Sequence, residues 1–514
     1  MRISTHQIQA AAISAIVNQQ ADLSRTQQQL SSGRRILSPS DDPVDATRAL
    51  GISQSISATQ QFQTNSGLAE GRLQLEESAL EGAGNLLQRV RELTIQANND
   101  SQNGTTRPLI ALEIRQRLDE LLSLSNTRDA NGEYIFSGFQ SLTQAFSQTS
   151  GSFIYNGDEG QRFLQTGPSR QVSTGNAGSE VFQLIKNGNG TFTVNDNTLN
   201  TGSGIIDPGS VTDVSAYTVD TFQIVLGEQT NVTGGAIGIT DTGTNDTLQY
   251  ELRVNGTLVY TANEGDSRTL AQIEADIDAQ SGTTNVEAFI DGGQLYLANV
   301  TPSATPITIN ETLTGATEDT DVVTGFFGAS LTGLSQPSVS TVYNDATGYV
   351  VLDSANAIVS SGAYSDGGNI AFNGIQTNVS GTPSNGDRFT VAPSTNQALF
   401  STLQNLIGAL EADPAIAGNE TEFHNAINRV LVDLDQGLTN IIDIRANVGA
   451  RLNSIEDQNG LNDESLLQLQ TTLSDIQDLD YAEAISRLES QRIGLEAAQQ
   501  SFVRIQGLSL FNFL

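Results

Sequence analysis

Apolar side chains recur every three or four residues at both ends of the chain, and this pattern constrains the fold more than any other feature. A helix that keeps an apolar stripe over many turns needs other helices packed along it. We therefore expect a coiled coil or bundle built from both termini. The stripe residues expected at its interface are Ile13, Ile16, Leu23, Leu30, Leu473, Ile476, Tyr481, Leu488, Leu495, Phe502 and Ile505.

Two glutamines, Gln20 and Gln27, interrupt the N-terminal stripe at positions where an apolar residue is expected. Polar residues at such positions fix the register of a coiled coil. The stripes could pack within one molecule or against neighbouring copies. We favour packing between copies, because so long a pair of stripes exceeds what a single globular core needs.

Local signals predict where several helices begin and end. Asp42 is a good N-cap and Pro43 suits the first helical position, so a helix is expected to start there. A stripe from Phe423 to Ile455 is expected to end at Gly460. A further long helix is expected over residues 466–510, with its apolar register slipping after Asp480.

The middle of the chain, residues 131–394, is rich in Gly, Thr, Asn, Asp and Val and has the signals of β-hairpins. Asn-Gly pairs at 255–256 and 373–374 are typical of two-residue turns between strands. Further hairpins are expected over 286–297 and over 182–194, and a short helix over 269–280.

The fold class expected is therefore α+β and multidomain, with a helical bundle or coiled coil formed by both termini and β-rich domains inserted in the middle. The expected divisions are 1–43 (N-terminal helix of the terminal coiled coil), 44–165 (N-terminal part of a helical bundle domain), 166–219 (first part of a β-rich domain), 220–336 (acidic β-rich insertion), 337–394 (second part of the β-rich domain), 395–462 (C-terminal part of the bundle domain) and 463–514 (C-terminal helix of the coiled coil).

Charge excludes several classes of partner. The net charge is −34, which repels nucleic acid and anionic membranes, so neither is expected to bind. Residues 220–336 hold 16 acidic and 2 basic residues and are expected to form a solvated projection. A calcium-binding lobe is the alternative, but Glu318-Asp319-Thr320-Asp321 lacks the ligand spacing of a calcium loop.

Catalytic and metal-binding patterns are missing from the sequence. The two histidines, His6 and His424, have no ligand-spaced partners, and the chain has no Cys. Lys186 is not preceded by the glycine-rich sequence of a phosphate-binding loop. We expect no enzyme activity, no cofactor and no metal. The N-terminus is a poor match to a cleaved signal peptide, so any export is expected to use another route.

Two segments carry a family resemblance. Residues 30–43 read LSSGRRILSPSDDP, and residues 129–138 read DANGEYIFSG. Both resemble the flagellin superfamily and, within it, the proteins of the hook–filament junction. The resemblance covers residues 1–170, 364–393 and 395–514 but not the insertion 220–336. Its motif residues are Ser38, Pro39, Asp41, Asp42, Pro43, Asn131, Gly132, Tyr134, Phe136 and Gly138.

This resemblance implies a structural, extracellular part of the bacterial flagellum, exported by the flagellar type III system without a cleaved signal. It implies a junction ring of about eleven copies between hook and filament, which templates flagellin assembly through its packed termini. The implied partners are other copies of the chain, a hook-side junction protein, flagellin and, before secretion, an export chaperone.

Two other functions remain open at this point. The chain could be a minor filament flagellin. Alternatively, the β lobe could be a surface adhesin that binds glycans, in which case exposed aromatic side chains are expected. The candidate residues Tyr343, Tyr349 and Tyr364 are scattered among Gly and Asp.

Overall fold

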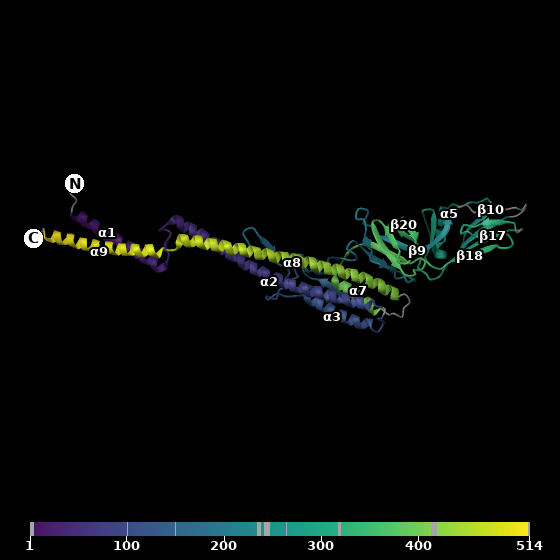
Figure 1. Ribbon diagram of the computed structural model, residues 1–514, viewed down its shortest axis with the longest axis horizontal. Helices are drawn as coiled ribbons and strands as arrows, with labels where there is room; N and C mark the ends of the chain where they lie inside the picture. Colours follow the sequence, from purple (N-terminus) through teal and green to yellow (C-terminus); the bar gives the residue numbers. More distant parts are fainter. Residues whose placement is uncertain are drawn as a thin grey trace. The chain divides into compact units, whose positions relative to one another are not determined.

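Long helices form both ends of the chain and β-strands form its middle (Figure 1), so the predicted fold class is confirmed. The computed structural model describes residues 5–99, 101–149, 151–233, 238–240, 247–263, 265–316, 320–412 and 419–511. The long helices are α1 (Thr5–Ser32), α2 (Pro43–Ala97), α3 (Arg107–Ser125), α7 (Leu399–Glu411), α8 (Asn419–Gln477) and α9 (Tyr481–Phe511). Three short ones are α4 (Gly178–Phe182), α5 (Leu270–Ala279) and α6 (Ser281–Thr284).

The chain divides into two compact units, and long helices contribute to both. Unit 1 comprises residues 1–74, 162–174 and 449–514, and unit 2 comprises residues 75–161 and 175–448. Unit 1 therefore contains α1, α9 and one part of each of α2 and α8. Unit 2 contains the rest of α2 and α8, the helices α3 to α7 and most of the strands.

Two predicted helix boundaries in the C-terminal part are wrong. Gly460 does not end a helix, because α8 runs through it to Gln477. Glycine in a helix interior costs only about 1 kcal/mol relative to alanine, and buried Ile455 and Leu466 hold the helix on either side. The helix expected over 466–510 is instead interrupted after Gln477, where the backbone of Asp478 pairs with that of Arg34.

The helices of unit 2 pack around a continuous apolar core. α3 packs against α7, and one face of each helix is buried. Arg91 reaches Asp435 at 2.7 Å, which links α2 to α8 by a polar contact beside this core. Buried members of the core include Leu80, Leu87, Ile114, Leu121, Leu403, Leu406, Val430, Leu434 and Ile441.

The largest sheet of unit 2 has seven strands, all paired antiparallel. Its order is β13-β14-β9-β19-β20, and β23 pairs with both β9 and β6. The central strand β9 is long enough to pair with β14, β19 and β23. The bounds are β6 (Phe192–Asp196), β9 (Phe222–Thr233), β13 (Val286–Asp291), β14 (Gln294–Asn299), β19 (Gly348–Leu352), β20 (Ile358–Ala363) and β23 (Arg388–Pro393).

Smaller sheets complete the β-rich part. One has the order β12-β11-β15-β18, from β11 (Gln249–Val254), β12 (Thr257–Asn263), β15 (Ile307–Thr314) and β18 (Ser338–Tyr343). Another has the order β10-β16-β17, from β10 (Gly238–Thr240), β16 (Val322–Thr324) and β17 (Ser330–Thr332). A third joins β21 (Asn369–Phe372), β22 (Ile375–Ser380), β7 (Ile205–Ile206) and β8 (Ser210–Val211). The two-stranded pairs are β1 (Phe146–Thr149) with β2 (Ser152–Tyr155), β3 (Phe163–Gln165) with β4 (Gln171–Ser173), and β5 (Ile185–Lys186) with β24 (Asn396–Gln397).

Turn chemistry predicted three of the four hairpins correctly. Asn255 and Gly256 both have positive φ angles (45° and 79°) between β11 and β12, as a type I′ turn requires. The hairpins β13–β14 and β21–β22 also form as predicted. The hairpin expected over 182–194 is wrong, because Phe182 ends the helix α4 and β5 pairs with β24.

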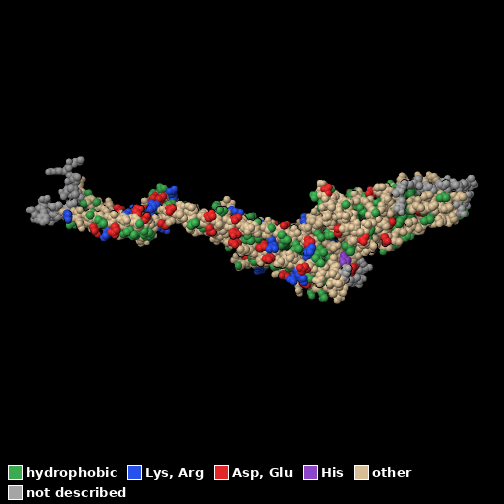
Figure 2. All heavy atoms as spheres, in the orientation of Figure 1, with side chains coloured by type: hydrophobic (Ala, Val, Ile, Leu, Met, Phe, Trp, Pro, Cys, Tyr) green, Lys and Arg blue, Asp and Glu red, His purple; other side chains and the backbone are tan. Residues whose placement is uncertain are grey.

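The acidic insertion 220–336 is not uniformly solvated. Glu311 and Asp321 are almost completely buried, at 1% and 0% exposure. Figure 2 shows mostly uncharged polar side chains and backbone on the described β-rich surface, with scattered acidic groups. Residues 318 and 319 of the acidic run considered for calcium lie outside the described residues. The three tyrosines considered for glycan binding are partly buried and pack against apolar clusters of the β-rich part: Tyr343, Tyr349 and Tyr364.

Candidate assembly site at the chain ends

The first and last helices of the chain lie side by side within unit 1 (Figure 1). Their approach is close, because a Cβ atom placed on Gly494 of α9 would lie 2.6 Å from the Gln19 Nε2 of α1. The predicted interface residues on these helices that are half-buried are Ile16, Leu23, Leu30, Leu488, Leu495 and Phe502. The pairing of the two terminal stripes is thus present within one chain.

One helix pair cannot bury all its apolar side chains. Among the residues of α1 and α9 whose exposure is described, only Thr26 and Ala484 are buried. Large apolar side chains remain in contact with solvent, namely Ile13 (50% exposed), Val17 (57%), Tyr481 (53%), Ile485 (50%), Ile493 (61%) and Val503 (66%). A row of such side chains on paired helices marks a surface for protein contacts.

The other predicted interface residues fall into three groups, which differ in their exposure and position. Gln20 and Gln27 are exposed on α1. Leu473 and Ile476 are half-buried at the end of α8. The side chain of Ile505 lies outside the described residues. Val17, Ile485, Ile493 and Val503 were not among the predicted interface residues.

The two terminal helices are joined to the rest of unit 1 at one place, which we call the clasp (residues 33–48 and 476–481). Gly33 ends α1 with a φ angle of +70°, and its N–H donates to the Gln29 carbonyl at 2.8 Å. The Arg35 N–H donates to the carbonyl of Gln477 at 2.7 Å, and the Leu479 N–H donates to Gly33 at 3.0 Å. Backbone hydrogen bonds thereby join two chain crossings: the N-terminal crossing is the connection from α1 to α2, and the C-terminal crossing is the connection from α8 to α9.

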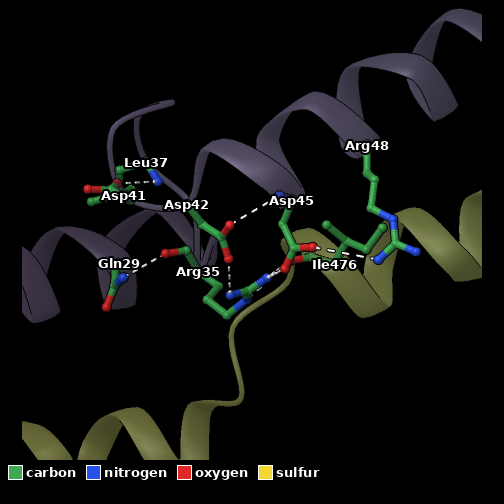
Figure 3. Close-up of polar contacts among 8 residues, drawn as sticks. All are labelled: Gln29, Arg35, Leu37, Asp41, Asp42, Asp45, Arg48 and Ile476. Carbon is green, nitrogen blue, oxygen red and sulfur yellow. Dashed lines mark hydrogen bonds and ion pairs between the residues drawn. The ribbon is translucent and has the colours of Figure 1, made fainter.

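Arg35 sits at the centre of the clasp (Figure 3). Its guanidinium donates to the Asp45 carboxylate at 2.6 Å, to the Asp42 carboxylate at 3.4 Å and to the Ile476 carbonyl oxygen at 2.9 Å. The hydrogen bond to Asp45 raises the pKa of Arg35 further above its ordinary value. One side chain of the N-terminal segment therefore joins the start of α2 to the end of α8.

The aspartates of the first motif organise the loop that precedes α2. The Asp41 carboxylate accepts hydrogen bonds from the N–H groups of Ser38 (2.9 Å) and Leu37 (3.1 Å) and pairs with Arg25 at 3.2 Å. The backbone hydrogen bond from Ser38 lowers the pKa of Asp41. Pro39 lies in a turn closed by the Asp41 N–H donating to the Ser38 carbonyl at 3.0 Å.

The predicted N-cap of α2 is confirmed. The Asp42 carboxylate accepts a hydrogen bond from the Asp45 N–H at 3.1 Å, and Pro43 is the first helical residue. This backbone hydrogen bond lowers the pKa of Asp42, so its carboxylate is ionised at neutral pH. Arg35 lies within the first motif but was not among the predicted site residues, because its acceptor at Ile476 lies 441 residues away.

The second motif belongs to unit 2 and shapes a loop there. Gly132 (φ +81°) and Gly138 (φ +65°) take conformations that favour glycine. The N–H of Asn131 donates to the Asp129 carboxylate at 2.9 Å. The ring of Tyr134 lies under the Arg128 guanidinium at 4.2 Å, and Phe136 is buried. These residues therefore have structural roles within unit 2.

Side chains that could bind a metal ion are scattered over the described part of the chain. Among those residues, no group of three or more His, Cys, Asp or Glu side chains could hold a metal ion. His424 contacts the side-chain oxygen of Asn98 through Nδ1 at 2.7 Å, and the His6 side chain lies outside the described residues. None of the described helices is long and apolar enough to span a membrane.

Comparison with family models decides the relationship. The model of the bacterial flagellin N-terminal helical region matches residues 3–141, and that of the C-terminal helical region matches residues 431–514. The two ends of the chain are thus similar to the two helical regions of bacterial flagellin. The resemblance inferred from the two motifs is thereby confirmed, and both matched regions contain helices of the clasp and of the terminal pair.

Among curated proteins, the chain is similar to hook-associated proteins and to flagellins. It is 32% identical over 185 residues to flagellar hook-associated protein 3 of Escherichia coli and to that of Salmonella typhimurium. Each match covers 36% of this chain, which spans 58% of the length of these relatives. It is also 33% identical over 135 residues to a phase 1 flagellin of Salmonella naestved, which covers 26% of this chain and 27% of that flagellin.

Solved structures of hook-associated proteins share the fold over most of this chain. The crystal structure of hook-associated protein 3 from Legionella pneumophila is 25% identical, with a TM-score of 0.56, and the match covers 83% of this chain and 98% of that one. FlgL of Xanthomonas campestris has the same TM-score at 24% identity, covering 82% and 99%. The predicted likeness to proteins of the hook–filament junction is thereby confirmed.

Proposed function

We propose that this chain is a structural component of the bacterial flagellum that forms the junction between hook and filament. The observation that carries the proposal is the terminal helix pair, which leaves Ile13, Val17, Ile485, Ile493 and Val503 at least half exposed. Both ends of the chain are similar to flagellin and carry apolar side chains exposed to solvent. Neighbouring subunits would bury these side chains. The similarity to hook-associated protein 3 supports a place at the junction.

Neighbouring copies would bury the exposed apolar side chains of α1 and α9. Burying one large apolar side chain contributes roughly 1.5–3 kcal/mol, while ordering each residue of a mobile helix costs about 1–2 kcal/mol. Assembly is therefore favourable only when many side chains dock together, and it should be cooperative. Exposed Gln20 and Gln27 then lie at positions where a neighbour's polar group can fix the register.

The clasp would set the direction in which the terminal pair leaves the rest of unit 1. Arg35, Asp42 and Asp45 hold the N-terminal crossing, and the same guanidinium holds the carbonyl oxygen of Ile476 at the C-terminal crossing. A shared attachment keeps both helices in one fixed geometry. Fixed geometry reduces the entropy lost when copies pack side by side.

The finer features of the proposal follow the resemblance. We propose a ring of about eleven copies that contacts a hook-side junction protein on one side and templates flagellin on the other. The chain would be exported by the flagellar type III system, with a chaperone covering its apolar termini before secretion. The β-rich residues 166–394 would face outward and carry out no chemistry, and the predicted domain divisions remain part of this proposal.

The decisive experiment changes the charge of the helix pair. Leu488→Asp puts a charge on the half-buried stripe and should abolish incorporation into flagella, while circular dichroism shows the β domains still folded. Ser490→Asp, on an exposed position of the same helix away from both Leu488 and Ile493, is the matched control and should incorporate normally. Filaments that grow normally from hooks carrying Leu488→Asp would contradict the proposal.

A minor filament flagellin is the second candidate, and the similarity to Salmonella flagellins favours it. Deleting the gene separates the two functions. Loss of a junction protein should release flagellin monomer into the medium, because filaments have no foundation. Loss of a minor flagellin should leave filaments attached. Immunoblotting of culture supernatants for flagellin measures the difference.

A further inference from the structure

A hollow lies in unit 2 between the helices α7 and α8 and the strands β6 and β24. Its volume is about 530 Å³, within the range of about 300–1,000 Å³ that is usual for small-molecule sites. All of its described lining residues belong to unit 2, and none comes from the terminal helix pair. The hollow is therefore separate from the candidate assembly site.

Carboxamide side chains make up most of the polar lining of this hollow, which we call the amide hollow. A carboxamide has two donor hydrogens and an acceptor oxygen, so one side chain can both donate to a ligand and accept from it. Glu422 and Asp433 add carboxylates, and Thr193 adds a hydroxyl. The five carboxamides are those of Asn187, Asn195, Gln397, Gln404 and Asn405.

The fold holds part of this polar lining in place. The Gln397 Nε2 donates to the Asp433 carboxylate at 2.9 Å and to the Thr402 hydroxyl at 2.8 Å. The other oxygen of the Asp433 carboxylate accepts from the Gly188 N–H at 2.7 Å. Both amide hydrogens of Gln397 are thereby engaged, so its amide oxygen is the group that can accept from a ligand. Its position is fixed before a ligand binds, which reduces the entropy lost on binding.

Two other carboxamides of the lining face no such demand from the fold. Within the part of the chain that the structure describes, no hydrogen bond joins the side-chain amide of Asn195 or Asn405 to another protein group. Asn405 is exposed and Asn195 is half-buried. Both amides can therefore exchange water for a ligand without breaking a contact within the protein.

Small residues line the helical wall of the amide hollow. Gly408, Ala409 and Ala426 come from α7 and α8, and a Cβ atom placed on Gly408 would have nothing within 4 Å. The opposite face of α7 is buried through Leu403 and Leu406, so the core holds this helix and keeps the space open. An apolar strip of short side chains thus lies beside the carboxamides.

A second hollow, of about 350 Å³, adjoins the amide hollow along α7. Gln404 and Gly408 line both hollows and lie about one helical turn apart on the same face of the helix. Arg115, Asp119 and Gln148 also line the second hollow. Two hollows that share a wall make an elongated site, which suits a chain of linked units better than one compact molecule.

Charge selects against an ionic ligand in the amide hollow. Arg429 is the one basic residue in its described lining, and its guanidinium pairs with the Asp196 carboxylate. Two carboxylates beside a neutralised arginine repel an anion. Asp433 already accepts two hydrogen bonds, and burial raises its pKa, while the charge of exposed Glu422 is screened by solvent. Neither carboxylate is therefore placed to hold a cation.

We propose that the amide hollow binds a neutral oligosaccharide. Sugar hydroxyls both donate and accept hydrogen bonds, as carboxamides do, and the C–H groups of a sugar ring can pack on the strip of Gly408, Ala409 and Ala426. The site is distinct from the three tyrosines considered above for glycan binding, which pack against apolar clusters. Such binding goes beyond the proposed role at the junction and does not require assembly.

A glycan array tests this proposal with the full-length chain. The array carries neutral oligosaccharides of hexoses and N-acetylhexosamines beside sialylated and sulfated ones and free amino sugars. The chain should bind at least one neutral oligosaccharide, and titration calorimetry with that oligosaccharide then gives its Kd. Binding to no neutral oligosaccharide, or only to the charged ones, would overturn the proposal.

Two substitutions locate the binding site. Gly408→Phe fills the space between the two hollows and should raise the Kd by about tenfold or more. Asn405→Ala removes one exposed carboxamide that holds no part of the fold, and it should raise the Kd by about threefold to tenfold. Thermal unfolding shows whether each variant is folded, and Asn405→Ala still tests the site if the larger change disturbs α7.

Gly460→Phe is the matched control for Gly408→Phe. Gly460 is likewise an exposed helical glycine with nothing within 4 Å of an added Cβ atom, but it lies in unit 1. Its replacement should leave the Kd unchanged. An unchanged Kd in both Gly408→Phe and Asn405→Ala would contradict the site. Normal incorporation of Leu488→Asp into flagella would contradict the proposed function and leave the oligosaccharide result as it stands.

Discussion

The hydroxyl of Tyr481 lies 2.8 Å from the place that a Cβ atom would take on Gly33. The two residues come from opposite ends of the chain and meet at the clasp, where α1 ends and α9 begins. Gly33 is therefore required twice, once for its φ angle of +70° and once for the space taken by Tyr481.

Gly33→Ala should loosen the clasp. A non-glycine residue in the left-handed region costs about 1–2 kcal/mol, and the contact with the Tyr481 hydroxyl adds a steric cost. Hydrogen exchange of the Arg35 and Leu479 amides, which pair across the clasp, should become correspondingly faster.

Two controls separate the contributions at Gly33. Tyr481→Phe in the Gly33→Ala background removes the hydroxyl, and the next Tyr481 atom, Cζ, lies 3.8 Å from the added Cβ. It should restore part of the protection, leaving the backbone cost. Gly67→Ala in α2 has nothing within 4 Å and should not accelerate exchange at all. Full rescue by Tyr481→Phe would show that the backbone angle is not limiting.

Arg35→Lys should also open the clasp, because one ammonium group cannot donate at once to Asp42, Asp45 and the carbonyl of Ile476. The Arg35 side chain is 41% exposed, so solvent screens its ion pairs. The expected loss is about 1 kcal/mol in the free energy of local opening. Hydrogen exchange of the same two amides measures it.

Arg48→Lys is the matched control for the substitution at Arg35. Arg48 is 72% exposed and approaches the same Asp45 carboxylate only to 3.9 Å. Its replacement should leave exchange at the clasp unchanged. Equal effects of the two substitutions would mean that general charge near Asp45, and not the geometry of Arg35, holds the two crossings together.

Because of Glu311, the β-rich insertion 220–336 should be more stable to unfolding in mild acid than at neutral pH. Its carboxylate accepts hydrogen bonds from the Tyr250 hydroxyl at 2.5 Å and the Ala329 N–H at 3.3 Å, and burial raises its pKa above the ordinary value of about 4.5. A carboxyl with a raised folded-state pKa binds a proton more readily in the folded state. The free energy of unfolding should therefore rise as the pH falls from neutral through that pKa, and stop rising near the unfolded value.

Two substitutions should change this pH dependence in opposite directions. Glu311→Gln removes the titrating group, so the slope on the acid side of neutral pH should flatten. Tyr250→Phe removes a hydrogen bond that lowers the pKa of Glu311, so the slope should steepen, with a stability loss of about 1–3 kcal/mol at neutral pH. Urea unfolding followed by circular dichroism measures both. Parallel slopes in the two variants would exclude Glu311 as the titrating group.

Local chemistry allowed much of the fold to be predicted from the sequence. The turn at Asn255-Gly256 needs two positive φ angles, and the start of α2 at Pro43 needs an acceptor at Asp42. Both requirements are met by residues next to each other in the chain. The apolar stripes likewise depend on a helical period that is local, so the terminal helices could be predicted before any partner was known.

Contacts between distant residues explain the failures. Phe182 lies in a helix because its ring packs against Phe136, Phe146 and Phe400, and no local pattern reports that cluster. The charge pattern suggested solvated acids in the insertion, yet Glu311 is buried because Tyr250 and the backbone of Phe327 and Ala329 satisfy it.

The sequence by itself determined that both chain ends are helices with apolar stripes, that the middle is β-rich, and that the chain resembles the flagellin superfamily. Periodicity, turn residues and motifs are properties of neighbouring positions, which is why they can be read without coordinates. Only the tertiary structure decided where α8 stops and that Arg35 holds the carbonyl of Ile476, 441 residues away. Such pairings depend on which backbone groups meet in space, and the order of residues does not contain that information locally.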